Sequence, residues 1–259
     1  MGKVIGRPKK KDRLGEENIN YQGCLMKIVQ YNSTKDILVE FQDEYKSVVH
    51  SAYKEFSNGS IKNPYFPSIL GVGIVGKKYS SNTKEYKIWN AMMRRCFSEK
   101  HKDKHPSYTD VICCDEWFLY ENFYEWLHKQ DNFNNWLYEY GWAIDKDILV
   151  KGNKIYSPET CLLVPQKVNS LFIKRTNDRG VYPIGVTKHE NKFRAKCDNP
   201  LLNKREHIGL YNTPEEAFYA YKEYKEKIIK EVAKDEFLKG NITQQCYEAM
   251  LKYEVEITD

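Results

Sequence analysis

Residues 184–224, IGVTKHENKFRAKCDNPLLNKREHIGLYNTPEEAFYAYKEY, decide the fold of the C-terminal part of this chain. They contain three short segments rich in β-branched and aromatic residues, each bounded by turn formers. The predicted strands are Ile184–Lys188, Lys192–Asp198 and Arg205–Tyr211. A helix should follow, because Thr213 is a good N-cap, Pro214 suits the first turn and Glu216 complements the helix dipole. The order predicts a three-stranded sheet backed by one helix.

The second predicted strand carries a basic residue at every other position. Successive side chains of a strand point to opposite faces, so Lys192, Arg194 and Lys196 should share one face. Phe193 and Ala195 should then point toward the helix. The sequence therefore predicts a basic face on the side of the sheet away from the helix.

This C-terminal segment resembles the ethylene-response-factor domain, which also occurs at the end of phage and homing HNH nucleases. The shared pieces are Ile184–Val186, Lys192–Ala195, His207–Tyr211 and Thr213–Tyr221. The resemblance implies that the sheet enters the major groove of double-stranded DNA and contacts bases and phosphates. It assigns DNA contact to Lys188, Lys192, Arg194, Lys196 and Arg205. A plain scaffold is the alternative, since Phe193 stands where the family has a tryptophan.

The central part of the chain, residues 79–178, should be an α/β domain. Apolar residues recur at helical spacing over Lys84–Phe97 and again over Glu116–Lys129, which predicts two amphipathic helices. Arg94 and Arg95 should lie on the outer side of the first helix, where they are candidates for DNA contact. The polar stretch Ser98–Tyr108 is expected to be a loop.

The same central part resembles the HNH, or His-Me finger, core of phage endonucleases. The shared pieces include Trp89–Met92, Ile144–Asp147, Gly152–Lys154, Ser157–Cys161 and Leu163–Pro165. An active core of this class needs a histidine base, an asparagine that orients it and a divalent metal against the phosphate. The resemblance assigns this degenerate centre to Asp145, Lys146, Asp147, Asn153 and Asn169.

Lys146 stands where the resemblance expects the histidine. A lysine of ordinary pKa is protonated at neutral pH and cannot act as a base. Mg²⁺ on Asp145 or Asp147 could supply a metal-bound water instead. The sequence thus favours a catalytically impaired DNA-binding scaffold, with an active metal-dependent DNA endonuclease as the alternative.

The seven cysteines point to free thiols or a metal site, because a cytosolic chain of this length rarely carries a disulfide framework. Cys96, Cys114, Cys161 and His105 would suit structural Zn²⁺. Their spacing lacks a CxxC pair, so buried small hydrophobic residues are the favoured interpretation.

The N-terminal part contains a basic arm, residues 1–13, and a small β module, residues 14–78. The arm includes Gly6-Arg7-Pro8 followed by Lys9, Lys10 and Lys11, and resembles an AT-hook. Arg7 would enter the minor groove of A·T-rich DNA. A solvated basic tail is the alternative. In the β module, Cys24–Tyr31 and Asp36–Phe41 are the clearest predicted strands.

Charge and composition limit the function classes. The net charge is +5, and residues 1–13 hold six basic and one acidic residue, so the rest of the chain is neutral. DNA affinity outside the arm must come from local patches. Mean hydropathy is −0.72 and no long apolar segment occurs, which predicts no membrane association and a cytoplasmic location, in the host if a phage encodes the chain.

These observations predict a multi-domain α+β protein whose C-terminal domain spans residues 179–259. Three functions stay open at this point. The first is a phage or mobile-element DNA-binding protein, and the second is an active HNH-type endonuclease. The third is a counter-defence protein that binds a host defence protein, alone or as an oligomer, which the neutral body and the abundance of Tyr and Trp would suit.

Overall fold

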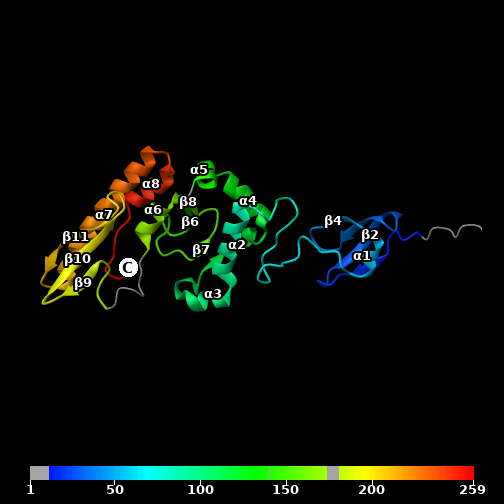
Figure 1. Ribbon diagram of the computed structural model, residues 1–259, viewed down its shortest axis with the longest axis horizontal. Helices are drawn as coiled ribbons and strands as arrows, with labels where there is room; N and C mark the ends of the chain where they lie inside the picture. Colours follow the sequence, from blue (N-terminus) through cyan, green and yellow to red (C-terminus); the bar gives the residue numbers. More distant parts are fainter. Residues whose placement is uncertain (1–11, 140, 174–180) are drawn as a thin grey trace, which may run out of the picture. The chain divides into compact units, whose positions relative to one another are not determined.

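The computed structural model describes residues 12–139, 141–173 and 181–259. These residues form helices and several small sheets, which confirms the multi-domain α+β prediction. They fall into two compact units (Figure 1). The first unit runs to Met93 and includes Asp115–Asn122, and the second comprises Arg94–Cys114 and Phe123–Asp259. The boundaries expected after residues 78 and 178 do not coincide with this division.

A four-stranded antiparallel sheet dominates the first unit. Its strands follow the order β1-β2-β3-β4 and precede a short helix, α1. The bounds are β1 Glu17–Ile19, β2 Leu25–Ser33, β3 Asp36–Phe41, β4 Val48–Ser51 and α1 Tyr53–Ser57. Alternate residues of β3 are buried, namely Ile37, Val39 and Phe41, and they pack with Met26 and Phe56 into a small core of their own. The predicted strands are present, with β1 and β4 added at the edges.

The second predicted helix of the central part is interrupted. The chain forms a 3₁₀ turn over Asp115–Phe118 and then α4 over Tyr120–His128. Ile74 causes the break, because its N–H bonds to the Phe118 carbonyl and its carbonyl accepts from the Tyr120 N–H, at 2.8 and 2.9 Å. Periodicity could not reveal this pairing with a distant residue. The first predicted helix, α2, spans Lys84–Phe97 as expected.

The second unit contains a β-β-α element. Strands β6 (Trp142–Asp145) and β8 (Leu162–Pro165) pair antiparallel, and α6 (Gln166–Asn169) follows β8 directly. A parallel pair, β5 (Ile112–Cys113) with β7 (Ile155–Tyr156), lies in the same unit. Two further helices are α3 (Glu99–Lys104) and α5 (Phe133–Tyr138). Helix α3 forms within the stretch expected to be a loop, because the Ser98 hydroxyl caps it by accepting from the His101 N–H.

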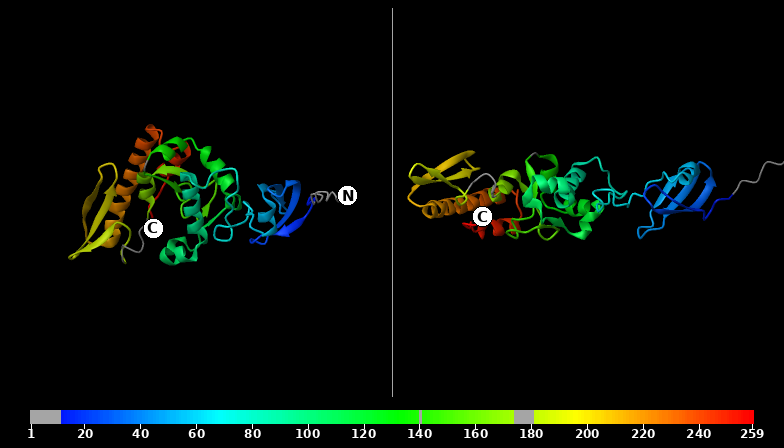
Figure 2. Two further views of the ribbon diagram at one scale, coloured as in Figure 1. Left: turned by 45° about the vertical axis from the view of Figure 1, so that its right-hand side comes forward. Right: turned by 90° about the horizontal axis from the view of Figure 1, so that it is seen from below.

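The C-terminal sheet and helix are the ones that the sequence predicts. Strands β9 (Val186–His189), β10 (Lys192–Asn199) and β11 (Lys204–Tyr211) are antiparallel in the order β11-β10-β9. Helix α7 (Pro214–Leu238) lies along this sheet, and α8 (Gln244–Leu251) packs against α7 (Figure 2). At the start of α7, Thr213 and Glu216 form a capping box.

One hydrophobic core runs through the β-β-α element and the C-terminal sheet. Val164 of β8 and Val168 of α6 belong to the same buried cluster as Ala195 of β10 and Ile229 of α7. The chain after α8 returns to this core, where Val255 is buried. The β-β-α element and the C-terminal sheet with its helix therefore share one core.

Gly185, just before β9, allows the sheet to approach α7 closely. Its φ is +78°, and a Cβ atom there would lie 2.1 Å from a ring carbon of Tyr221.

We expect Gly185→Ala to lower the free energy of unfolding by about 2–4 kcal/mol, because the alanine would add both backbone strain and overpacking against Tyr221. Urea unfolding measures this. Gly240→Ala is the matched control, because Gly240 has φ +70° but open space around it, so it should lose only about 1 kcal/mol. Equal losses in both variants would contradict the close approach.

Candidate nucleic-acid interface

The outer face of the C-terminal sheet is built by the alternation of β10. Ala195 and Cys197 are buried toward α7, and Phe193 packs against the same core. Lys192, Arg194 and Lys196 alternate with them and therefore point away from the helix. We call this side, with its cross-strand neighbours on β9 and β11, the outer face.

The residues directly across the sheet from these three cations are uncharged or histidine. The register places Lys192 opposite His189, and Lys196 opposite His207. Arg194 lies between Thr187 on β9 and Leu210 on β11. No acidic side chain stands directly across the sheet from any of the three, so their positive charge is not cancelled by their cross-strand partners.

His189 positions the guanidinium of Arg194. The Nδ1 atom of His189 contacts a terminal nitrogen of Arg194. A guanidinium can only donate, so the ring nitrogen of His189 is the acceptor in this contact. Sequence analysis did not single out His189. The signal was available, because the turn Glu190-Asn191 between two strands sets His189 opposite Lys192.

Lys188 lies on the other face of the sheet, which corrects its assignment to the outer face. It stands directly opposite Phe193 in the register, and its Nζ lies 4.3 Å from the centroid of that ring. Directly opposite residues of an antiparallel pair share a face, so Lys188 is on the α7 side. Spacing along β9 alone could not show this, because the register with β10 decides it.

Arg205 lies on the outer face but is engaged within the sheet. Its Nε and a terminal nitrogen donate to the two carboxylate oxygens of Asp198, at 2.6 and 3.0 Å. This hydrogen-bonded pair raises the pKa of Arg205 further above its usual value. Arg205 thus neutralises the acidic residue at the end of β10 and leaves Arg194 and the two lysines as the main basic groups of this face.

The residues assigned to a degenerate catalytic centre meet at the end of β6. Asp145 is buried, and its Oδ1 accepts from the N–H groups of Asp147 and Ile148, at 2.7 and 2.8 Å. Asn153 Nδ2 donates to the carbonyls of Lys146 and Ile155, at 2.8 and 2.6 Å. These two side chains fix the turn between β6 and β7 by hydrogen bonds to backbone groups.

Lys146 is locked into the same turn. Its Nζ lies 2.7 and 2.8 Å from the two carboxylate oxygens of Asp147 and 2.7 Å from the Asn153 carbonyl. An ammonium has three protons, so these contacts use its donor capacity fully. The Lys146 Nζ is therefore committed to this turn.

The donor set around Lys146 does not fit a catalytic divalent metal. Asp147 faces an ammonium, Asp145 accepts two backbone N–H groups, and the Asn153 amide is bound to the backbone. Asn169 lies at the end of α6, which packs against β6 and β8. Within the ranges that the structure describes, no group of three or more His, Cys, Asp or Glu side chains is arranged to hold a metal ion.

The zinc ligand set of Cys96, Cys114, Cys161 and His105 is likewise not assembled among the described residues. Cys96 and Cys161 are buried, whereas His105 is exposed. Burial raises the pKa of the Cys161 thiol to about 12. The burial of Cys96 and Cys161 matches the interpretation of these two cysteines as small hydrophobic core residues, whereas Cys114 is half-buried.

The two arginines at the end of α2 differ in accessibility. Arg94 is exposed. Arg95 is half-buried, with a terminal nitrogen 3.5 Å from the Tyr156 hydroxyl and its guanidinium carbon 5.9 Å from the centroid of the Tyr108 ring. Arg95 therefore serves packing within the second unit, and only Arg94 stays a candidate for DNA contact. The arm residues Arg7, Lys9, Lys10 and Lys11 lie outside the described residues.

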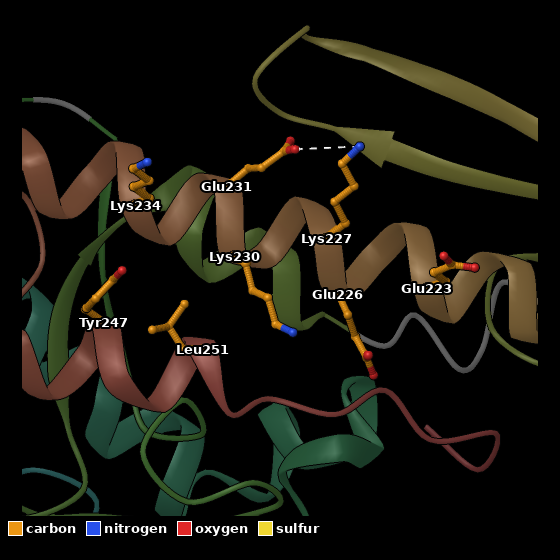
Figure 3. A pocket seen from close by; sticks show the side chains of 8 residues that line it. All are labelled: Glu223, Glu226, Lys227, Lys230, Glu231, Lys234, Tyr247 and Leu251. Atoms are coloured by element: carbon orange, nitrogen blue, oxygen red, sulfur yellow. Dashed lines mark ion pairs between the residues drawn. The ribbon is translucent and has the colours of Figure 1, made fainter.

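A groove of about 500 Å³ lies between α7 and α8 (Figure 3). Tyr247 and Leu251 of α8 point toward α7, which lines the groove with glutamates and lysines. The charged lining residues are Glu223, Glu226, Lys227, Lys230, Glu231 and Lys234. The two signs balance, and Lys227 pairs with Glu231 at 3.9 Å, so the groove has no net preference for an anionic ligand.

Compared with known proteins, the chain matches no family model, no curated protein and no solved structure. A functional assignment must therefore rest on the geometry of its own residues. In addition, no helix among the described residues is both long and apolar enough to cross a membrane.

The buried carboxyl of Asp145 should make stability depend on pH. Burial raises its pKa above the ordinary value, although the two backbone N–H groups oppose this. Its contribution to stability is therefore fully present below the unfolded-state pKa, about 3.9, and is lost as pH rises through the folded-state pKa. As the pH rises from about 3.9 through the folded-state pKa of Asp145, we expect the wild type to lose stability relative to Asp145→Asn. Urea unfolding at several pH values measures it, and parallel profiles for the two proteins would contradict the expectation.

Proposed function

We propose that this chain is a DNA-binding protein that contacts double-stranded DNA with the outer face of its C-terminal sheet. The observation that carries the proposal is the alignment of Lys192, Arg194 and Lys196 on one face with no acidic residue directly across from them. A β-sheet of this width fits the major groove, where arginine can bind both acceptors of guanine and lysine can meet phosphates.

The β-β-α element supports a nuclease-like scaffold without nuclease activity. The order β6, β8, α6 matches the secondary structure of a ββα-metal core. If the resemblance to HNH enzymes holds, Lys146 stands in place of their histidine base, and its contacts with both carboxylate oxygens of Asp147 support a turn without metal and water. We therefore favour DNA binding without cleavage, as in a phage or mobile-element regulator.

Purified protein should not nick DNA. With supercoiled plasmid and Mg²⁺, Mn²⁺ or Zn²⁺, we expect no conversion to open-circular or linear forms, because Lys146 Nζ is engaged by Asp147 and by the Asn153 carbonyl. Gel electrophoresis of the plasmid measures this. Nicking that disappears in Asn153→Ala would instead establish the endonuclease alternative, since a contaminating nuclease would be indifferent to that substitution.

Substitutions on the two faces of the sheet should differ in their effect on DNA binding. Lys192→Ala and Lys196→Ala should each weaken binding to all sequences and reduce the slope of log K against log salt by about 0.9. Arg194→Ala should change sequence preference, because a bidentate arginine–guanine contact contributes about 1–3 kcal/mol of discrimination. Binding-site selection and salt titrations measure these effects.

Lys188→Ala is the matched control, since it removes the same charge from the α7 side of the sheet. It should leave slope and preference unchanged. If all four substitutions had equal effects, the outer face would contribute only non-specific positive charge and would make no specific contact with DNA. If a folded Arg194→Ala protein keeps full affinity and preference, the sheet does not read DNA, and binding to a host protein becomes the leading function.

A further inference from the structure

The turn between β10 and β11 carries two exposed leucines. It consists of Pro200, Leu201, Leu202 and Asn203, and the side chains of Leu201 and Leu202 are 40% and 57% exposed. Turns at the surface normally carry polar residues or glycine. The turn between β9 and β10, Glu190-Asn191, follows that rule, so the leucine pair is a local exception that packing does not explain.

This turn is held in one conformation. Asn199 is buried, and its Oδ1 accepts from the N–H groups of Leu201 and Leu202, at 3.0 and 3.3 Å. Its Nδ2 donates to the Tyr224 hydroxyl of α7, at 3.2 Å. A backbone held in this way lowers the entropy lost when the leucines contact a partner, which is what a binding element requires.

Basic residues flank the leucine pair. Lys204 and Arg205 begin β11 immediately after the turn, and both side chains are more than half exposed, but each is paired with an acidic residue, Lys204 with Glu206 at 2.7 Å and Arg205 with Asp198 at 2.6 Å. Arg205 lies on the outer face, so the turn forms one end of the surface proposed to meet DNA. The leucines therefore extend the outer face with an apolar tip, which suits an apolar group of the ligand that this face binds.

We propose that Leu201 and Leu202 contact the C5-methyl groups of thymine in the DNA that the outer face binds. In the major groove, thymine alone presents a methyl group among the four bases, and apolar side chains are its natural partners. This inference rests on the proposed DNA-binding function. It adds a second element of sequence recognition to the surface. The leucines would recognise thymine by burying its methyl group, whereas Arg194 would recognise a base by hydrogen bonding.

The test uses the duplex recovered by binding-site selection with the wild-type protein. Each thymine is replaced in turn by deoxyuridine, which lacks only the methyl group. Affinity is measured for wild type, for the combined variant Leu201→Ala/Leu202→Ala, and for the control Leu238→Ala, which removes a leucine that is 76% exposed on α7. Thermal melting verifies that all three proteins are folded.

At one or two thymines, loss of the methyl should weaken wild-type binding about fourfold, which corresponds to one buried methyl group. The combined variant should bind the thymine duplex more weakly and be indifferent to deoxyuridine, while Leu238→Ala should behave as wild type. If wild type tolerates every deoxyuridine, or if the variant stays as sensitive as wild type, the thymine contact is refuted while DNA binding stands. If selection recovers no duplex at all, the proposed function fails and this inference fails with it.

Discussion

Helix α7 has to bury one apolar stripe against two different partners, and the second unit depends on this constraint. In its N-terminal part, Tyr221 packs over Gly185, and Tyr224 bonds to Asn199 of the sheet. Further along the helix, Phe237 stacks on Tyr247 of α8, with ring centroids 4.7 Å apart. A 25-residue helix can serve both partners because it is far longer than one small sheet needs.

Glu236 shows how tightly the C-terminal part of α7 is integrated. Its side chain is fully buried, pairs with Lys167 of α6 and accepts from Asn241 Nδ2 at 3.0 Å. A buried carboxylate is costly unless it is paired and hydrogen-bonded. The pair fixes the helix of the β-β-α element to the helix that backs the sheet, so the outer face and the locked turn at Lys146 belong to one body.

This integration gives the proposed function a simple physical basis. A rigid sheet offers its charges in a fixed register, which favours sequence-dependent binding over loose electrostatic attraction. The turn at Lys146 is equally fixed, but its polar groups are directed at one another and at the backbone. The same scaffold therefore keeps one surface open to a ligand while the residues expected at a catalytic centre serve the fold.

The sequence by itself determined the local elements of the C-terminal part. The alternation of Lys192, Arg194 and Lys196, the capping signals at Thr213 and Pro214, and the turn formers between strands are short-range effects, and the predicted sheet and helix are present. These features follow from steric and hydrogen-bonding preferences of neighbouring residues, which a single chain segment already contains.

Only the tertiary structure decided which groups are available to a ligand. The register of β9 on β10 placed Lys188 over Phe193, the packing of Tyr108 and Tyr156 enclosed Arg95, and Asp198 engaged Arg205. It also broke the helix before Tyr120 through Ile74. Each outcome depends on residues distant in sequence, because face, burial and partner are set by which segments the shared core brings together.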